Sequence, residues 1–502
     1  MISIDGKSLT LMQFRDVVLG SADCGLSADA RERVDIGRRT VEETVSRGDA
    51  TYGVNTGFGD LATVRIEDKN LALLQERLIL SHCAGVGEPL PDTAVRGMLL
   101  LRANTLARGH SGARALLVES LLTLLNSGVL PLVPSRGSVG ASGDLAPLAH
   151  LALPLLGKGE VRIDGEVLPA ARGLERAGLA PLTLEPKEGL ALINGTQAMT
   201  SLLALSVLAC RRLVRISDFV AAMSTDALRG TDSAFDARLH ALRPHPGQQA
   251  SAANIWRLMQ GSGIRESHRQ GDVRVQDPYS VRCAPQVHGA VRDLLDDVER
   301  KVVIEMNSVT DNPLIFPDEG DIVSGGNFHG EPMALAADIL ALGVSELGAI
   351  SERRIEKLTN SAFSGLPPFL TPDAGLNSGF MMAQVTAAAL ASENKTFCHP
   401  ASVDSIPTSA DKEDHVSMGM GAALKLQPVV DNTYRILAIE LTAAAQGIDL
   451  LRPLRSSETI EELHGAFRQC VAALKEDREM APDLNAAYVF LDEIDGFLDK
   501  LQ

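Results

Sequence analysis

The segment GSVGASGDLAPLAH, residues 137–150, places three glycines around a single serine, Ser142, and follows them directly with Asp144. Three common motifs do not fit it. A nucleophile elbow would need glycine in place of Asp144, a P-loop would need a lysine after its last glycine, and the dinucleotide-binding fingerprint has another glycine spacing. If the segment has no catalytic role, its residues predict a tight turn that leads into a helix, with Asp144 as the helix cap.

The same residues also fit a specific backbone reaction. If the amide nitrogen of Gly143 is pressed against the carbonyl carbon of Ala141, the backbone can close into a five-membered ring with loss of one water. Ser142 can then lose its hydroxyl group as a second water, which leaves a methylidene-imidazolone, a strong electrophile that needs no external cofactor. Glycine lets the nitrogen approach because it has no Cβ. Asp144 is placed to assist the proton transfers, and a following helix N-terminus would favour negative charge on the ring oxygen.

Ala141-Ser142-Gly143-Asp144 closely resembles the prosthetic-group loop of the aromatic amino acid ammonia-lyase family. Seven other segments resemble the same family, in its order: YGVNTGFG (52–59), RANTLARGHSG (102–112), LINGTQAM (192–199), QDPYSVRCAPQVHG (276–289), GGNFHGEP (325–332), GLPPFL (365–370) and ASVDSIPTSADKEDHVSMG (401–419). The resemblance covers nearly the whole chain. It implies an all-α homotetramer with active sites shared between subunits, and elimination of ammonia from an α-amino acid to give an α,β-unsaturated acid.

Three residues near the loop receive roles from this resemblance. Tyr52 becomes the candidate base on a loop that closes the site, and a phenol with a free pKa of about 10 would need its anion stabilised there. Asn194 would lie near the prosthetic group and the substrate, and Phe328 against the substrate ring. Each also has an ordinary structural interpretation: a packed tyrosine, a helix N-cap with capping-box spacing to Gln197, and a core aromatic residue.

The motif QDPYSVRC carries the candidates for binding the substrate carboxylate. Asp277 is a plausible helix cap with Pro278 at the first helical position, so Tyr279 and Arg282 would share one helix face. The guanidinium of Arg282 can hold a carboxylate through two parallel hydrogen bonds. The resemblance assigns it that role, with Gln276 and the catalytic candidate Tyr279 alongside.

Two positions bear on the choice of amino acid. Ser81-His82-Cys83-Ala84-Gly85 resembles the histidine-selective members, and Glu413 stands where phenylalanine- and tyrosine-selective members usually carry glutamine. A carboxylate can accept the N–H of an imidazole, but facing a phenyl ring it would lose its solvation without gaining a partner. The resemblance therefore implies histidine as substrate, with urocanate and ammonia as products. Lys412 departs from the family pattern and either pairs with Glu413 or points outward.

Other functions remain open from the sequence. The nearest are the same chemistry on tyrosine or phenylalanine and a 2,3-aminomutase with the same prosthetic group. A fumarase- or aspartase-type helical lyase would share the architecture without a modified backbone. A non-enzymatic helical scaffold would have no need for the glycine spacing of the loop.

Composition restricts the class of protein that must position these residues. The chain has 502 residues, is 45% hydrophobic but only 4% aromatic, and has a formal net charge of −17. Such an acidic surface disfavours nucleic-acid and membrane-surface partners. Six scattered cysteines form no metal-like cluster with histidine, so we expect no metal and reduced thiols in a cytoplasmic protein. The first residues, MISIDGKSL, do not fit a signal peptide, and no apolar run free of proline or glycine is long enough to span a membrane.

Hydrophobic periodicity predicts mostly helices. The long patterns are residues 94–130 with a break near 109–112, 331–360, 379–396 and 433–451. Residues 159–169 predict a β-hairpin around the turn dipeptide Asp164-Gly165. We expect an all-α fold, a long-helix bundle of the aspartase/ammonia-lyase type, as a single unit over 1–502. Its N-terminal lobe (1–200) would carry the glycine-rich loop, and residues 201–502 the central bundle and C-terminal helices.

Overall fold

The computed structural model describes residues 1–20, 22–48, 51–57, 59–61, 63–272 and 274–501. The chain divides into two compact units. The first combines Met1–Leu208, Val298–Asp338 and Pro400–Leu424, and the second combines Ala209–Asp297, Ile339–His399 and Lys425–Gln502. The lobe predicted at 1–200 therefore lies inside the first unit, together with two later segments.

The first unit contains short helices and all nine strands found in the described part of the chain. Its helices are α1 (Leu11–Val18), α2 (Ala28–Arg47), α3 (Leu71–His82), α4 (Asp92–Leu106), α5 (Ala115–Asn126), α6 (Leu145–Ala152), α7 (Ala170–Arg176) and α8 (Glu188–Ile193), with 3-10 turns at Gly59–Leu61, Asp68–Asn70 and Leu153–Leu156. Its strands are β1 (Ile2–Ile4), β2 (Cys24–Leu26), β3 (Val86–Pro89), β4 (Leu130–Pro131), β5 (Pro134–Arg136), β6 (Glu160–Ile163), β7 (Glu166–Pro169), β8 (Leu314–Phe316) and β9 (Asp321–Val323).

The predicted hairpin is confirmed as β6 and β7, which pair in antiparallel register and are joined by β4 into a three-stranded sheet. Asp164 and Gly165 both have positive φ, 51° and 84°, as a type I′ turn requires. The remaining sheets each have two strands, β1–β2, β3–β5 and β8–β9. Such small sheets serve as local connections, so the helices carry the fold, as the all-α prediction requires.

Four long helices contribute residues to both units: α9 (Gln197–Ala227), α14 (Ala284–Met306), α15 (Glu331–Thr359) and α18 (Gly419–Leu450). The second unit adds α10 (Ala237–Ala241), α11 (Pro246–Met259), α12 (Gly263–Glu266), α13 (Tyr279–Arg282), α16 (Ser361–Ser364), α17 (Met381–Phe397), α19 (Glu458–Cys470), α20 (Ala481–Asp492) and α21 (Asp495–Leu498), with 3-10 turns at Asp232–Phe235, Pro368–Leu370 and Asp499–Leu501.

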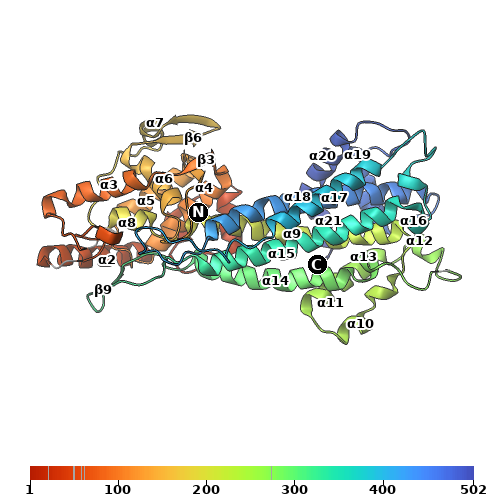
Figure 1. Cartoon of the computed structure of the whole chain (residues 1–502), viewed down its shortest axis with the longest axis horizontal. Helices are drawn as coiled ribbons and strands as arrows, with labels where there is room; N and C mark the ends of the chain where they lie inside the picture. Colours follow the sequence, from red (N-terminus) through yellow and green to blue (C-terminus); the bar gives the residue numbers. More distant parts are fainter. Residues whose placement is uncertain (21, 49–50, 58, 62, 273, 502) are drawn as a thin grey trace. The chain divides into compact units, whose positions relative to one another are not determined.

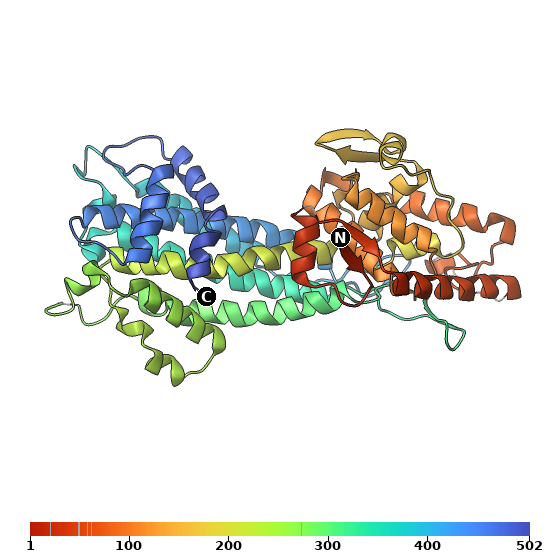
Figure 2. The same ribbon diagram turned by 180° about the vertical axis from the view of Figure 1, so that it is seen from behind.

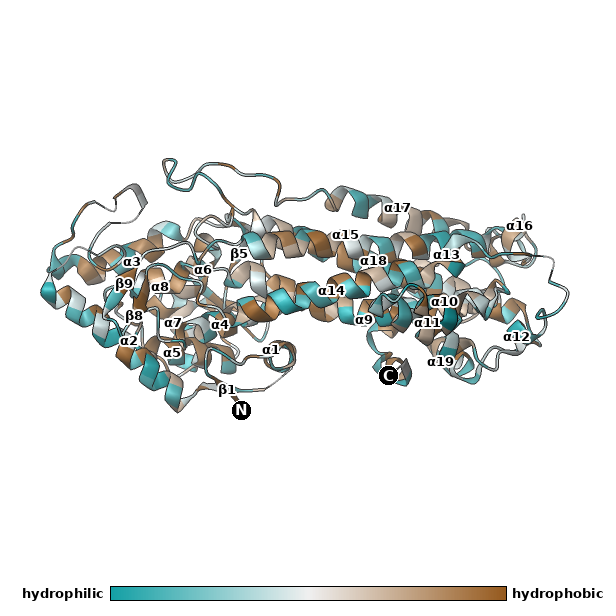
Figure 3. Cartoon of the chain, turned by 90° about the horizontal axis from the view of Figure 1, so that it is seen from below, coloured by the Kyte–Doolittle hydropathy of each residue, from teal (hydrophilic) through white to brown (hydrophobic). Residues whose placement is uncertain are grey.

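Within the second unit, α9, α14, α15, α17 and α18 lie side by side as a bundle (Figures 1 and 2). On α14, Val291, Leu295, Val298 and Val302 recur at helical spacing and are buried, and Figure 3 shows hydrophobic and hydrophilic residues alternating along that helix. Polar side chains also join neighbouring helices. Glu440 of α18, for example, accepts hydrogen bonds from Ser224 of α9 at 2.6 Å and from Arg354 of α15 at 2.8 Å.

The helix predictions hold, with one boundary wrong. The pattern at 94–130 becomes α4 and α5, separated at Gly109 and Gly112, both of which have positive φ. The helix predicted from 433 begins earlier, at Gly419, because α18 continues through Pro428. A proline usually ends a helix, since it lacks the N–H and crowds the preceding turn, so the pattern underestimated this helix.

Helix α15 is long and apolar enough to meet a length and composition test for a membrane span. Its most apolar window is 67% buried inside the described structure, and the core helix of a soluble protein meets the same test. The helix also contains Gly343 and Gly348, the type of interruption noted in the sequence.

Candidate active site

The backbone of the glycine-rich loop is fixed against the turn that follows α8. Gly140 and Gly143 have φ of 69° and 70°, a region that favours glycine. Gly143 forms an isolated parallel bridge with Gly195, and a Cβ at residue 143 would lie 2.2 Å from the Gly195 carbonyl oxygen. The next amide, that of Asp144, donates to the same oxygen at 2.7 Å. Position 143 therefore admits only glycine.

Asn194 connects the loop to the protein interior. It follows the last residue of α8, and its side-chain amide donates to the carbonyl oxygen of Ser142 at 2.8 Å. Its own carbonyl accepts from the buried guanidinium of Arg102 at 2.8 Å. The predicted capping box is wrong, because Gln197 directs its side chain to Arg102, Thr105 and Thr310.

Asp144 occupies the N-cap position of α6, as the sequence predicts, but its side chain makes no capping hydrogen bond to that helix. It precedes α6, but its carboxylate accepts from the backbone amide of Met199, in the first turn of α9, at 2.9 Å and from the hydroxyl of Ser138 at 3.1 Å. The side chain is completely buried. Burial raises the pKa of Asp144 to about 7, although these hydrogen bonds oppose the shift.

A cavity of about 690 Å³ opens beside this loop, within the first unit. The predicted site residues that line it are Tyr52, His82, Ala141, Ser142, Asn194, Phe328 and Glu413. Its walls also include Leu78, Leu145, Leu190, Asn312, Ser324, His329, Lys412 and His415. Five of the eight segments compared with the family contribute residues to this cavity. A sixth contributes Arg102, which binds Asn194 from the side away from the cavity.

Glu413 reaches the reactive loop directly. One carboxylate oxygen accepts from the Ser142 hydroxyl at 2.8 Å, and the other accepts from the Thr408 hydroxyl at 2.6 Å. A short bridge between Thr408 and Glu413 holds this segment in place. A carboxylate therefore stands at the reactive serine, inside the cavity.

His82 ends α3 with its Nδ1 2.8 Å from the carbonyl oxygen of Leu78. Burial lowers the pKa of His82, while the Leu78 carbonyl and the charge of Glu413 oppose that shift. Because a carbonyl can only accept, Nδ1 carries the proton of the neutral ring and Nε2 is left as an acceptor. The cavity wall thus offers two acceptors, His82 and Glu413, to N–H groups of a ligand.

Tyr52 lies in a turn, as predicted, and lines the cavity. Its hydroxyl oxygen accepts from the backbone amide of Gly59 at 3.4 Å. Phe58 of the same motif lies outside the described residues.

Gln276, Tyr279 and Arg282 belong to the second unit and are not among the residues that line the cavity. The guanidinium of Arg282 lies 4.5 Å from the centre of the Tyr279 ring, so these side chains share a face as predicted. Tyr279 is 70% exposed. Asp277 does not cap α13, because its carboxylate accepts from the amide of Thr231 at 2.6 Å and Pro278 takes the cap position.

A profile of the family "Aromatic amino acid lyase" matches residues 9–469. The chain belongs to this family. A relative named histidine ammonia-lyase, from Anaeromyxobacter sp. (strain K), is 54% identical over 498 residues, 98% of each chain. The crystal structure of histidine ammonia-lyase from Trypanosoma cruzi superposes with a TM-score of 0.92 at 45% identity, covering 100% of this chain and 95% of the other. Tyrosine aminomutase from Streptomyces globisporus gives a TM-score of 0.93 at 38% identity, covering 99% and 98%.

Buried charged residues lie behind this aromatic amino acid lyase site and are not among the residues predicted from the sequence. Burial lowers the pKa of Arg102 to about 10, although the charge of Asp311 opposes the shift. Asp311 itself pairs with Lys187 at 2.9 Å, and both side chains are completely buried. An arginine inside the apolar pattern of residues 94–106 was the available signal. Lys187 and Asp311 lie too far apart in the sequence for their spacing to reveal that they pair with each other.

Proposed function

We propose that this protein removes ammonia from L-histidine, without oxidation, to give urocanate, which makes it a carbon–nitrogen lyase. The observation that carries this proposal is the pair of acceptors, His82 and Glu413, in the cavity beside Ser142. An imidazole presents N–H groups to such acceptors, whereas a phenyl ring presents none. The names of the relatives, which match over nearly their full length, support the same substrate.

We infer that Ala141, Ser142 and Gly143 form a methylidene-imidazolone, and the loop fits this group. Position 143 admits only glycine, and the Ser142 carbonyl, which would become the ring oxygen, already accepts from Asn194. Asp144, with a pKa near 7, can both take and return a proton at neutral pH. When formed, the group supplies an electrophilic carbon that activates the departure of the amine.

The remaining roles follow from position. Asn194 stabilises negative charge at the Ser142 carbonyl oxygen, with Arg102 fixing its backbone from behind. Tyr52 removes the β-proton of the substrate, and Phe328 packs against its ring. Glu413 and His82 are the acceptors for the imidazole, which donates one N–H when neutral and two when protonated. These assignments leave the substrate carboxylate without the arginine that the resemblance assigns to it, since Lys412 is the cation in the cavity wall and Arg282 is not among the lining residues.

We propose that Gln276, Tyr279 and Arg282 of a neighbouring subunit supply that partner in a homotetramer. Large apolar side chains that are exposed in the single chain support an oligomer: Leu335, Ile339 and Leu342 on α15, and Met382 and Val385 on α17. The high exposure of Tyr279 agrees with a residue that another subunit covers. All six cysteines are free, which supports a cytoplasmic location.

The direct test is incubation of the purified protein with L-histidine, L-tyrosine and L-phenylalanine, followed by ultraviolet detection of the conjugated acid. We expect urocanate from histidine and little product from the others. The intact mass should be lower than that of the translated chain by two waters. Ser142→Ala should fold normally and lose nearly all turnover and the mass deficit. Near-normal activity of Ser142→Ala would contradict the proposed prosthetic group.

Substrate choice has its own variant. Glu413→Gln keeps the size of the side chain and its bond to Ser142, but it replaces a carboxylate with an amide. We expect kcat/KM for histidine to fall at least tenfold more than that for phenylalanine. An equal loss on both substrates would contradict the role of Glu413. Formation of a β-amino acid in place of urocanate would indicate a 2,3-aminomutase, the activity for which the Streptomyces globisporus structure is named.

A further inference from the structure

Three potential metal ligands come together at the rim of the active-site cavity. His329 and Glu331 stand at the start of α15, and His415 lies in the segment before α18. Each residue offers one ligand atom, and these three atoms all lie within 4.8 Å of one another. The two imidazole rings are parallel, with centroids 5.8 Å apart and an angle of 3° between their planes.

Glu331 provides a separate observation. Its Oε2 atom is buried and has no hydrogen-bond partner within the described part of the chain. A buried carboxylate oxygen without a donor costs more free energy than most unsatisfied groups, because it carries charge. The neighbouring His329 does not donate to it, since the ring lies within 3.4 Å of the Glu331 amide and 3.3 Å of the His415 carbonyl oxygen. A cation would satisfy this oxygen.

We propose that His329, Glu331 and His415 bind a divalent transition-metal ion, for which Zn²⁺ is the best fit. Two imidazoles and one carboxylate form a ligand set that suits zinc and leaves a fourth position open. In a tetrahedral zinc site, donor atoms lie about 3.3 Å apart. The present spacing therefore needs to shorten by about 1.5 Å at most. The two contacts of the His329 ring are long and cost little to exchange for metal bonds.

The proposed metal site lies next to residues that we propose to bind the substrate. His329 follows Phe328 and His415 is two residues after Glu413, and both histidines line the cavity of about 690 Å³. By binding His329 and His415 together, the ion would cross-link the turn that contains Phe328 and the segment that contains Glu413. His329 and Glu331 also line a second cavity of about 1070 Å³, which gives the ion a route to the site. The ion thus positions Glu413 and leaves its open coordination position at the cavity rim.

Metal binding can be measured without relying on the proposed reaction. The full-length Ser142→Ala chain, stripped of metal by a chelator, should be titrated with Co²⁺ by visible absorption and with Zn²⁺ by calorimetry. We expect one equivalent of Co²⁺ per chain, with the intense absorption of a four-coordinate site, and its displacement by Zn²⁺. Glu331→Gln and His415→Gln in the same background should each weaken binding at least tenfold.

A matched control removes one exposed imidazole elsewhere. His245→Gln should bind the same equivalent with unchanged affinity, since His245 lies just before α11, far along the chain from the three ligands. Equal binding in all variants would assign the metal to scattered histidines and overturn the proposal. Absence of binding to the parent chain, or only the weak absorption of a six-coordinate ion, would also overturn it. These last two readouts remain valid even if a variant fails to fold.

Discussion

Two aspartates, one in each unit, are equally buried and have opposite surroundings. Asp218, in the second unit, pairs with Arg292 and accepts from Nδ1 of His288 and Nδ2 of Asn254, each at 2.8 Å. Burial alone would raise its pKa, but these partners hold the pKa of Asp218 well below its usual range. Asp144, in the first unit, accepts from the backbone amides of Met199 and Ala198 and from the Ser138 hydroxyl, none of which carries a charge, and burial raises its pKa to about 7.

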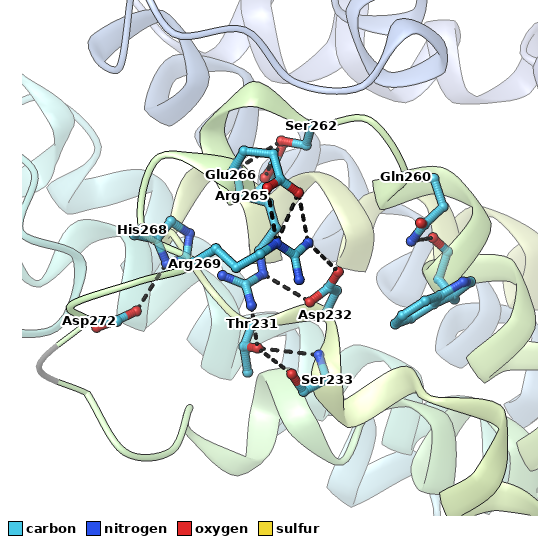
Figure 4. A network of polar contacts seen from close by, with 12 residues as sticks. Thr231, Asp232, Ser233, Gln260, Ser262, Arg265, Glu266, His268, Arg269 and Asp272 are labelled. Atoms are coloured by element: carbon cyan, nitrogen blue, oxygen red, sulfur yellow. Dashed lines mark hydrogen bonds and ion pairs between the residues drawn. The ribbon is translucent and has the colours of Figure 1, made fainter.

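The difference separates a structural charge from a chemical one. A buried carboxylate with a matched cation stays ionised and holds its neighbours, whereas one with only dipolar partners can exchange a proton near neutral pH. Figure 4 shows the structural pattern again in the second unit, where Asp232 lies between Arg265 at 2.9 Å and Arg269 at 3.2 Å. The pKa of Asp232 is lowered, because both arginines outweigh its burial.

The largest expected effect is on the chemical aspartate. Asp144→Asn keeps the shape of the side chain but removes its ability to take up a proton. We expect formation of the prosthetic group to slow by roughly 100-fold or more, as for loss of a general acid or base. Intact mass measured over time after expression checks this. A complete two-water deficit at the earliest time would show that Asp144 has no such role.

Asp218→Asn should give the reverse result. It leaves the partly buried Arg292 guanidinium without its counter-charge, and breaking a fully buried pair typically costs about 3–5 kcal/mol, an upper bound here. We expect a large decrease in the free energy of unfolding, measured with urea, and an unchanged mass deficit in the folded fraction. Normal stability together with impaired maturation would mean that the two aspartates had been assigned the wrong way round.

The sequence predicted local features well and long-range partners poorly. The hairpin at Asp164-Gly165 and the long helix α15 follow from turn chemistry and periodicity over adjacent residues. Five of the eight similar segments contain residues that line the cavity, because the resemblance does not depend on how the chain folds between them. In contrast, the sequence placed Asp144 correctly at the N-cap position of α6 but did not show that its carboxylate accepts from Met199, in another helix.

The residues of the proposed metal site illustrate the same limit. No spacing within the sequence suggests that His329 and His415 lie close together, since the segment between them includes three helices, α15, α16 and α17. Metal motifs that can be read from sequence have their ligands close together, often on one turn or one helix. Only the fold brings this pair together, and only the packing shows that Oε2 of Glu331 has no donor among the residues that the structure describes.

The smallest effect is on the pH dependence of stability, and its sign differs for the two aspartates. Between pH 4 and 7 the folded chain holds a proton on Asp144 that the unfolded chain has released, so the stability contributed by this group falls as pH rises through about 7. The contribution of Asp218 is present above pH 4 and is lost only as pH falls below that, since its folded pKa is lowered.

Urea unfolding of Ser142→Ala and of Ser142→Ala/Asp144→Asn at pH 5 and pH 8 isolates the first effect, because neither chain can form the prosthetic group. We expect the parent to lose more stability than the double variant between these two pH values. Parallel losses would mean that Asp144 is ionised in the folded chain at pH 5, and its difference from Asp218 would then lie in its partners alone.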